Sequence, residues 1–228
     1  MGERPPLPVV ALISGSGTNL QALIDAQLRG APFRLAAVIS NRADALGLER
    51  ARRHDIPTRV LSHRDYSDRE SFDSKLAELI DAFTPGLVVL AGFMRILTAG
   101  FVDRYQGRMM NIHPSLLPKF RGLHTHQRAI DAGEAEHGAS VHFVTAELDG
   151  GPVILQARVP VQPDDDAESL AARVLEREHL LYPTAVSWFA EGRLQLGEDG
   201  HPHLDARPLL EPRTLEPPSP AQEIQAAR

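Results

Sequence analysis

The hydrophobic positions in the first part of the chain predict short buried strands that alternate with helices. The first apolar run covers residues 9–13 and ends in the polar, glycine-containing segment 14–19. Leucine and isoleucine then recur over residues 20–28 at the spacing of one helical face. A strand, a glycine loop and a helix in this order are typical of the first unit of an α/β fold.

The same alternation continues as far as residue 113. Further strands are predicted at 35–40, 58–61, 87–91 and 108–113. Helices are predicted at 43–54 and 69–83, with a short helix before the last strand. Strands joined through helices run parallel, with right-handed crossovers. The sequence therefore predicts an α/β protein with a Rossmann-like, mostly parallel sheet flanked by helices.

The pattern changes after residue 113. Residues 139–145 and 153–161 both look like strands, and the turn-forming segment 149–152 lies between them in place of a helix. They are predicted to pair antiparallel. A long helix should follow, capped by Asp165 or Asp166 and kinked by the proline inside it.

The chain is expected to divide into three parts. Residues 7–196 form one domain with the sheet and its helices. Residues 197–210 can form a hairpin extension around an Asp-Gly turn, which makes a C-terminal antiparallel extension of the fold. Residues 211–228 are rich in proline and poor in apolar residues, so a disordered tail is predicted there.

Composition narrows the classes of function. The 228 residues include 24 basic and 30 acidic ones, for a formal charge of −6, so a broad nucleic-acid surface is not expected. The absence of cysteine excludes thiol nucleophiles, thiolate zinc sites and disulfides, and it suits a reducing compartment. No apolar run reaches the roughly 20 residues that span a bilayer, and the first residues are too polar for a signal peptide. A cytoplasmic protein without membrane contact is expected.

The end of the strand at 108–113 carries the strongest chemical signal. Asn111 and His113 are two residues apart in a strand, so their side chains should project to the same face. Asp149 lies in a turn and can be aimed at the histidine, where a carboxylate favours the imidazolium form. The alternative is a structural histidine at a strand end.

The glycine loop suits a phosphate better than a dinucleotide. Gly15 and Gly17 allow backbone amides to approach an anion, and the next helix offers its positive end. The third glycine of the dinucleotide fingerprint is replaced by Leu20, and residues 40–42 lack the acid that would hold a ribose hydroxyl. A tight turn without a ligand is the alternative.

Two charged residues lie where apolar ones are expected. Arg95 follows a buried strand, at the sheet edge where α/β proteins bind ligands, and the alternative is a surface ion pair. Glu178 shares a helical stripe with leucine and valine, so it requires a polar neighbour, either a ligand or a buried arginine.

Several histidines are close enough in sequence to raise the question of a metal site: His113, His124, His126, His137 and His142. Their spacing matches no closed ligand pattern, and cysteine is absent. We therefore expect no metal.

Four segments together resemble the folate-dependent phosphoribosylglycinamide formyltransferases of purine biosynthesis, within the formyltransferase superfamily. They are residues 13–20, 91–97, 111–118 and 147–152, and residues 122–126 add a more particular match. The resemblance covers about residues 9–196. It implies that 7–196 is a formyltransferase catalytic domain and that 10-formyltetrahydrofolate donates the formyl group to glycinamide ribonucleotide.

The resemblance also implies roles for individual residues. The catalytic set is Asn111, His113 and Asp149. The glycinamide ribonucleotide set is Gly17, Thr18, Asn19 and Glu178. The folate set is Arg69, Met94, Arg95, Ile96, Leu97, Asn111, Thr145, Ala146, Glu147, Leu148 and Asp149. The implied partners are these two small molecules, without nucleic acid, and a homodimer is the assembly that the resemblance allows.

Three other functions are weighed against this one. A methionyl-tRNA formyltransferase should carry a further C-terminal domain, and a formyltetrahydrofolate hydrolase a further N-terminal one; neither is expected here. A non-enzymatic phosphate sensor would need the glycine loop but not a converging Asn, His and Asp. Their joint presence favours an enzyme.

Overall fold

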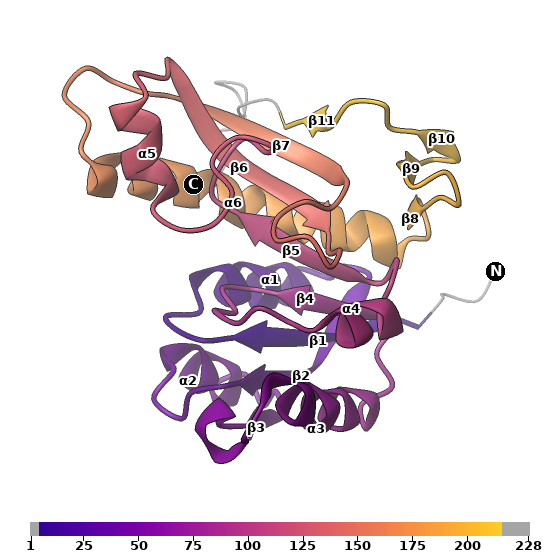
Figure 1. Cartoon of the computed structure of the whole chain (residues 1–228). Helices are drawn as coiled ribbons and strands as arrows, with labels where there is room; N and C mark the ends of the chain where they lie inside the picture. Colours follow the sequence, from indigo (N-terminus) through magenta and orange to yellow (C-terminus); the bar gives the residue numbers. More distant parts are fainter. Residues whose placement is uncertain (1–4, 216–228) are drawn as a thin grey trace.

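The computed structural model describes residues 5–215, in which eight strands form one sheet (Figure 1). Its strands are β1 (Leu7–Ile13), β2 (Phe33–Ser40), β3 (Thr58–Val60), β4 (Leu87–Leu90), β5 (Met109–His113), β6 (Glu136–Phe143), β7 (Val153–Pro160) and β11 (Arg213–Thr214). Their order is β11-β7-β6-β5-β4-β1-β2-β3, and β6 runs antiparallel to both β5 and β7. The predicted parallel sheet with an antiparallel pair is confirmed.

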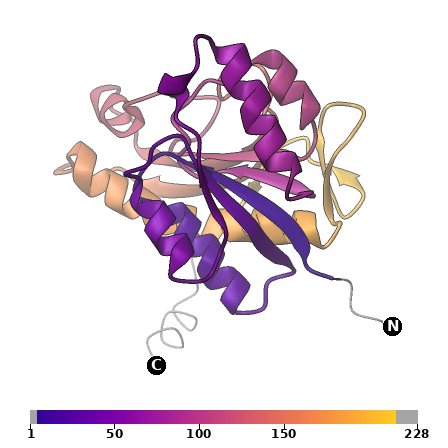
Figure 2. The same ribbon diagram turned by 90° about the horizontal axis from the view of Figure 1, so that it is seen from below.

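Helices cover both faces of this sheet (Figures 1 and 2). They are α1 (Thr18–Leu28), α2 (Leu46–Arg52), α3 (Arg69–Asp81), α4 (Ala99–Arg104), α5 (Thr125–Asp131) and α6 (Ala167–Ala190), with a 3-10 turn at His63–Asp65. Residues of α1, α2 and α6 share one hydrophobic cluster, whereas α3 and α4 contribute to the other. The two clusters are separated by the sheet, so both sides of the buried strands are apolar, as parallel strands require.

The position of β1 between β4 and β2 determines where a ligand can bind. The chain moves outward from β1 to β2 and β3, and then returns to the other side of β1 to form β4 and β5. The loops after β1 and β4 therefore leave in opposite directions at the carboxyl edge of the sheet. In open α/β sheets, this reversal opens the crevice in which ligands bind.

The long helix α6 begins where the sequence predicted. Asp166 accepts a hydrogen bond from the backbone N–H of Ser169 at 2.8 Å, and the Ser169 hydroxyl accepts one from the Asp166 N–H at 3.0 Å. This reciprocal pair satisfies N–H groups that the first helical turn leaves free. The helix then continues as one element through Pro183.

The C-terminal part departs from the prediction at one point. Strands β8 (Leu194–Leu196), β9 (Pro202–Leu204) and β10 (Arg207–Pro208) form a small antiparallel sheet. Residues 211–215, expected to start a disordered tail, instead include β11, which pairs in parallel with β7. The edge of β7 offers unpaired backbone groups that even a short strand can satisfy. The remainder of the predicted tail, 216–228, lies outside the described residues.

Over residues 5–215, no helix combines the length and apolar character needed to cross a membrane.

Candidate active site

Two neighbouring cavities open at the carboxyl edge of the sheet. The larger, of about 450 Å³, is lined by the loops after β1, β2, β3 and β4, and the smaller, of about 100 Å³, by the loops after β4 and β6 and the end of β5. Arg95 lines both. The register of the sheet explains this proximity, because Leu12 pairs with Leu90 and Leu90 pairs with Asn111. The residues that follow these three positions therefore lie side by side.

The glycine loop lies on the larger cavity and leads directly into α1. Gly17 has a left-handed backbone, with φ of 70°, and a side-chain Cβ there would lie 2.5 Å from the Gly47 Cα atom of α2. Glycine is therefore required both by the backbone conformation and by the packing of the two helices. Gly17 precedes the first turn of α1, which contains no acidic residue. The free N–H groups of this first turn can therefore receive an anion.

Asn19 and Glu178 meet beside this loop although they are far apart in the sequence. The Asn19 Nδ2 atom donates to the Glu178 Oε2 atom at 2.6 Å. Glu178 is 7% exposed, and its burial raises the pKa of the carboxyl group above its ordinary value. The polar neighbour predicted for Glu178 is thus an asparagine on α1, and the alternative of a buried arginine partner is wrong.

His113 and Asp149 lie together at the end of β5. The His113 Nδ1 atom is 3.4 Å from the Asp149 Oδ2 atom, and the Nε2 atom is 3.0 Å from the Phe120 carbonyl oxygen. Both ring nitrogens thus face acceptors, and only the imidazolium form has a proton on each. Asp149 also accepts the Gly122 backbone N–H at 2.9 Å. The carboxylate therefore joins the loop after β5 to the loop after β6.

Asn111 is oriented by a histidine that the sequence did not single out for this role. In the sheet, Asn111 of β5 pairs with His142 of β6, and the Asn111 Nδ2 atom donates to the His142 Nε2 atom at 3.2 Å. The His142 Nδ1–H donates to the Phe143 carbonyl oxygen at 2.9 Å. Burial lowers the pKa of His142 to about 4, so at neutral pH the ring is uncharged and its Nε2 atom accepts. His142 thereby fixes which end of the amide faces the cavity.

The neutral state of His142 also decides its relation to Asp149. The His142 Nε2 atom lies 3.8 Å from the Asp149 Oδ1 atom. An uncharged ring that already accepts a hydrogen bond at Nε2 forms no ion pair there. Asp149 therefore has one histidine partner at neutral pH, which is His113.

Most residues of the predicted folate set line the smaller cavity. They are Arg95, Ile96, Leu97, Asn111, Thr145, Ala146, Glu147, Leu148 and Asp149. Met94 lines the larger cavity and is 67% exposed. Arg69 begins α3, is exposed and lines neither cavity, so the structure does not bring it together with the others.

Arg95 is packed against an aromatic ring. The centre of its guanidinium group lies 5.7 Å from the centroid of the Phe72 ring, and its Nε atom is buried without a hydrogen-bond partner among the described residues. The alternative for Arg95 was a surface ion pair, but the contact that the structure shows is with the Phe72 ring. A guanidinium on an aromatic face is restricted in its motion, while its remaining N–H groups stay available to an anionic group.

The remaining histidines do not assemble with His113 into a metal centre. His137 and His126 interact at 3.2 Å between Nε2 and Nδ1, and His124 is exposed before α5. Burial lowers the pKa of His137 to about 4, so it acts as a neutral hydrogen-bonding ring. Within residues 5–215, no three His, Cys, Asp or Glu side chains converge as metal ligands.

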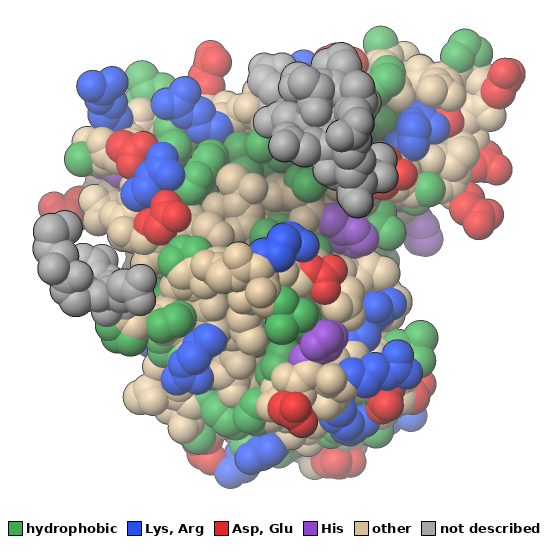
Figure 3. Space-filling view, turned by 180° about the vertical axis from the view of Figure 1, so that it is seen from behind, with side chains coloured by type: hydrophobic (Ala, Val, Ile, Leu, Met, Phe, Trp, Pro, Cys, Tyr) green, Lys and Arg blue, Asp and Glu red, His purple; other side chains and the backbone are tan. Residues whose placement is uncertain are grey.

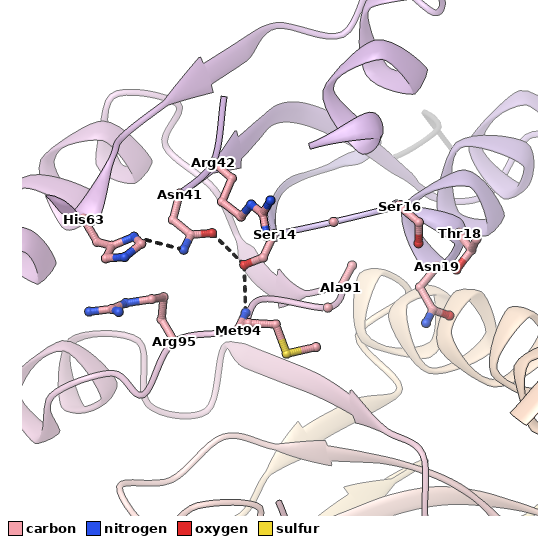
Figure 4. Close-up of a pocket in the computed structure, with 13 residues that line it drawn as sticks. Ser14, Ser16, Thr18, Asn19, Asn41, Arg42, His63, Ala91, Met94 and Arg95 are labelled. Atoms are coloured by element: carbon pink, nitrogen blue, oxygen red, sulfur yellow. Dashed lines mark hydrogen bonds between the residues drawn. The ribbon is translucent and has the colours of Figure 1, made fainter. Parts of the chain in front are cut away.

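A short polar chain connects the four loops that line the larger cavity (Figure 4). The Ser14 hydroxyl donates to the Asn41 Oδ1 atom at 2.6 Å and accepts the Met94 backbone N–H at 2.8 Å. The Asn41 Nδ2 atom lies 3.4 Å from the His63 Nδ1 atom. Sequence analysis missed Ser14, Asn41 and His63 as parts of the site, because only the order of the strands makes them neighbours.

The sequence of this chain is similar to a protein-family model and to known proteins. The model of the formyl transferase family matches residues 7–186. Phosphoribosylglycinamide formyltransferase of Escherichia coli strain K12 is 55% identical over 195 residues, which are 84% of this chain and 91% of that protein. The human trifunctional purine biosynthetic protein adenosine-3 is 45% identical over 87% of this chain and 20% of its own length.

The fold of this chain is also similar to that of a solved structure. Phosphoribosylglycinamide formyltransferase of Coxiella burnetii superimposes with a TM-score of 0.89 at 53% sequence identity, over 92% of this chain and all of that one.

Proposed function

This chain belongs to the formyl transferase family, and we propose that its site transfers the formyl group of 10-formyltetrahydrofolate to the amine of glycinamide ribonucleotide. The products are formylglycinamide ribonucleotide and tetrahydrofolate, in purine biosynthesis. The family, the fold class and the formyltransferase activity predicted from the sequence are confirmed by the relatives. The assignment of residues is supported by the pairing of His113 with Asp149 and by the position of Asn111 and Asp149 on the smaller cavity.

The reaction begins with attack by the uncharged glycinamide amine on the formyl carbon. A tetrahedral intermediate forms, and its oxygen carries new negative charge. One Asn111 N–H is held by His142, which leaves the second for this oxygen. A preorganised donor of this kind typically contributes about 3 kcal/mol to stabilisation of the transition state.

His113 supplies the second donor in this proposal. Its Nε2–H points to the Phe120 carbonyl oxygen, so the reacting oxygen has to share or replace that acceptor. Asp149 holds the Nδ1 side and orients the ring. A proton must finally move from the attacking amine to the departing folate nitrogen, and His113 can carry it directly or through water.

The two cavities suit two different substrates. Gly17, Thr18 and Asn19 lie on the larger cavity, where the N–H groups of α1 can receive the phosphate of the ribonucleotide. Glu178, held by Asn19, lies beside it. The smaller cavity, with Ile96 and the loop 145–149, receives the folate. Asn111 and Asp149 line this smaller cavity, and Arg95 lines both cavities.

The partners in this proposal are these two small molecules. The formal charge of −6 argues against binding of a polyanion. The face drawn in Figure 3 shows acidic and basic side chains interspersed, without a continuous basic area. We also propose a cytoplasmic location, supported by the absence of cysteine, and a catalytic domain at 7–196 that can assemble as a homodimer.

The direct test of this function uses purified full-length protein. Incubation with glycinamide ribonucleotide and 10-formyltetrahydrofolate should produce formylated ribonucleotide and tetrahydrofolate in equal amounts. Omission of the ribonucleotide separates transfer from hydrolysis. Release of formate at the same rate without the ribonucleotide would assign the site to a hydrolase instead.

Turnover should not depend on a bound metal ion. In the proposed mechanism, the side chains of Asn111 and His113 stabilise the developing charge, so no Lewis acid is needed. Exhaustive chelation followed by assay in metal-free buffer should leave turnover unchanged. Loss of turnover that zinc or another divalent ion restores would contradict this prediction.

Replacing Glu178 with glutamine should stabilise the protein but weaken ribonucleotide binding. Burial raises the pKa of Glu178, so ionising it as pH rises costs stability in the folded state. Glutamine stays neutral, and its NH₂ group could also donate to the Asn19 Oδ1 atom, which has no partner within the described residues. We expect about 1 kcal/mol of added stability at neutral pH.

Two measurements check the Glu178→Gln prediction. The difference in melting temperature between the variant and the parent should grow from acid to neutral pH. Only the parent loses stability when the buried group at position 178 ionises. The KM for glycinamide ribonucleotide should rise, whereas the KM for 10-formyltetrahydrofolate stays near the parent value. A variant with lower stability at every pH, or with an unchanged ribonucleotide KM, would contradict the role of Glu178.

A further inference from the structure

The segment from Met94 to Thr98 joins β4 to α4, and it carries four residues of the proposed folate set. It has no regular secondary structure before Ala99, so contacts with other elements must determine its position. We propose that Asp73, on α3 and outside both substrate cavities, is a positioning residue that fixes this segment for folate binding. The inference rests on the proposed function, because it concerns the folate side of that site.

Asp73 is buried where an apolar side chain is expected. It lies on α3 next to Phe72 and is 3% exposed. Its Oδ2 atom accepts the backbone N–H of Thr98 at 2.6 Å, while its Oδ1 atom has no hydrogen-bond partner in the described part of the chain. Burying a carboxylate is unfavourable unless a good donor compensates for it. The bond to Thr98 is therefore the specific contribution of this side chain.

The bond between Asp73 and Thr98 lies where the segment from Met94 to Thr98 ends and α4 begins. The Thr98 hydroxyl accepts the Phe101 N–H at 3.4 Å and thus caps α4. Thr98 directly follows Leu97, which lines the smaller cavity. A charge-assisted bond to the Thr98 N–H therefore sets where Leu97 and Ile96 enter that cavity.

The residue before Asp73 supports the same segment. The Phe72 ring is 1% exposed and lies under the guanidinium group of Arg95. Two consecutive residues of α3 thus contact Arg95 and Thr98, which are three positions apart in the segment. Because α3 is a rigid element packed on the sheet, these contacts transmit its position to the folate cavity.

The other end of the segment is held from a different direction. The Met94 N–H donates to the Ser14 hydroxyl (Figure 4). The Ser14 N–H donates to the Gly92 carbonyl oxygen at 3.0 Å. These contacts come from the loop after β1 and are independent of α3. Loss of Asp73 should therefore release the Ile96 and Leu97 end while leaving Met94 and the phosphate loop in place.

The test compares the Michaelis constants of the two substrates. Asp73→Ala should raise the KM for 10-formyltetrahydrofolate about tenfold, as expected for loss of one charge-assisted bond. The KM for glycinamide ribonucleotide should stay within about twofold of the parent value. Asp73→Asn keeps an oxygen acceptor for the Thr98 N–H. Its KM for 10-formyltetrahydrofolate should therefore lie between that of the parent and that of Asp73→Ala. Glu70→Ala, which removes an exposed carboxylate from the same helix, is the matched control.

A second pair of variants removes the bond from the donor side. Thr98 has φ of −70°, which proline adopts, so Thr98→Pro deletes the N–H with a compatible backbone. Thr98→Ala removes the helix cap but keeps the N–H. Thr98→Pro should raise the folate KM well above that of Thr98→Ala, and this pair decides the question if Asp73→Ala does not fold. Equilibrium titration with a folate analogue should follow the same order.

Several outcomes would overturn the inference. An unchanged folate KM in folded Asp73→Ala, an equal rise in both constants, or an Asp73→Asn variant as impaired as Asp73→Ala would each reduce Asp73 to a core residue. So would equal folate constants in Thr98→Pro and Thr98→Ala. If the parent protein does not transfer the formyl group between the two substrates, the proposed function is wrong, and so is the inference that rests on it.

Discussion

Replacing His113 with alanine should lower turnover about a hundredfold or more. The imidazole is expected both to donate to the oxygen of the tetrahedral intermediate and to carry the proton to the leaving nitrogen. Its side chain is 7% exposed and contacts Asp149 and the Phe120 carbonyl oxygen. Strand β5 pairs with β4 and β6 through backbone groups, so we expect His113→Ala to keep this pairing.

Steady-state rates at saturating concentrations of both substrates measure this effect. Circular dichroism and thermal unfolding should show that His113→Ala is folded. His201→Ala, an exposed histidine in the C-terminal extension, is a matched control and should retain parent turnover. A folded His113→Ala variant with near-normal turnover would remove His113 from the mechanism and leave Asn111 as the remaining donor.

Replacing Asp149 with asparagine should lower turnover by a similar order, roughly tenfold to a hundredfold. Asp149 has φ of 48°, and asparagine is one of the few residues that adopts this left-handed backbone readily. The substitution therefore keeps the turn and an acceptor for the Gly122 N–H, while it removes the charge beside His113. Asp103→Asn, on an exposed face of α4, is the control for loss of one carboxylate.

A double-mutant cycle tests whether Asp149 acts through His113. If it does, Asp149→Asn should reduce turnover strongly in the parent but only slightly in the His113→Ala background. Independent contributions would instead multiply, so that the double variant would be far slower than either single one. Such multiplication would falsify the proposed pairing even though both residues would remain necessary.

The sequence alone determined the parts of this protein that depend on neighbouring residues. Short apolar runs separated by helical patterns predicted the parallel strands, because a strand buried on both faces needs apolar side chains at every position. The aspartate cap of α6, expected at Asp165 or Asp166, and the glycine at position 17 are readable for the same local reason. So was the shared face of Asn111 and His113, since the strand repeats every two residues.

Only the tertiary structure decided which distant residues meet. Glu178 required a polar neighbour by its pattern, but Asn19, 159 positions away, became that neighbour through the packing of α6 on α1. His142 orients Asn111 because β5 and β6 pair in one register, and a shift of one residue would have turned it to the other face. Periodicity describes one element at a time, whereas these contacts depend on strand order, register and helix packing. The bond between Asp73 and Thr98 belongs to the same class, and so does the pairing of β11 with β7.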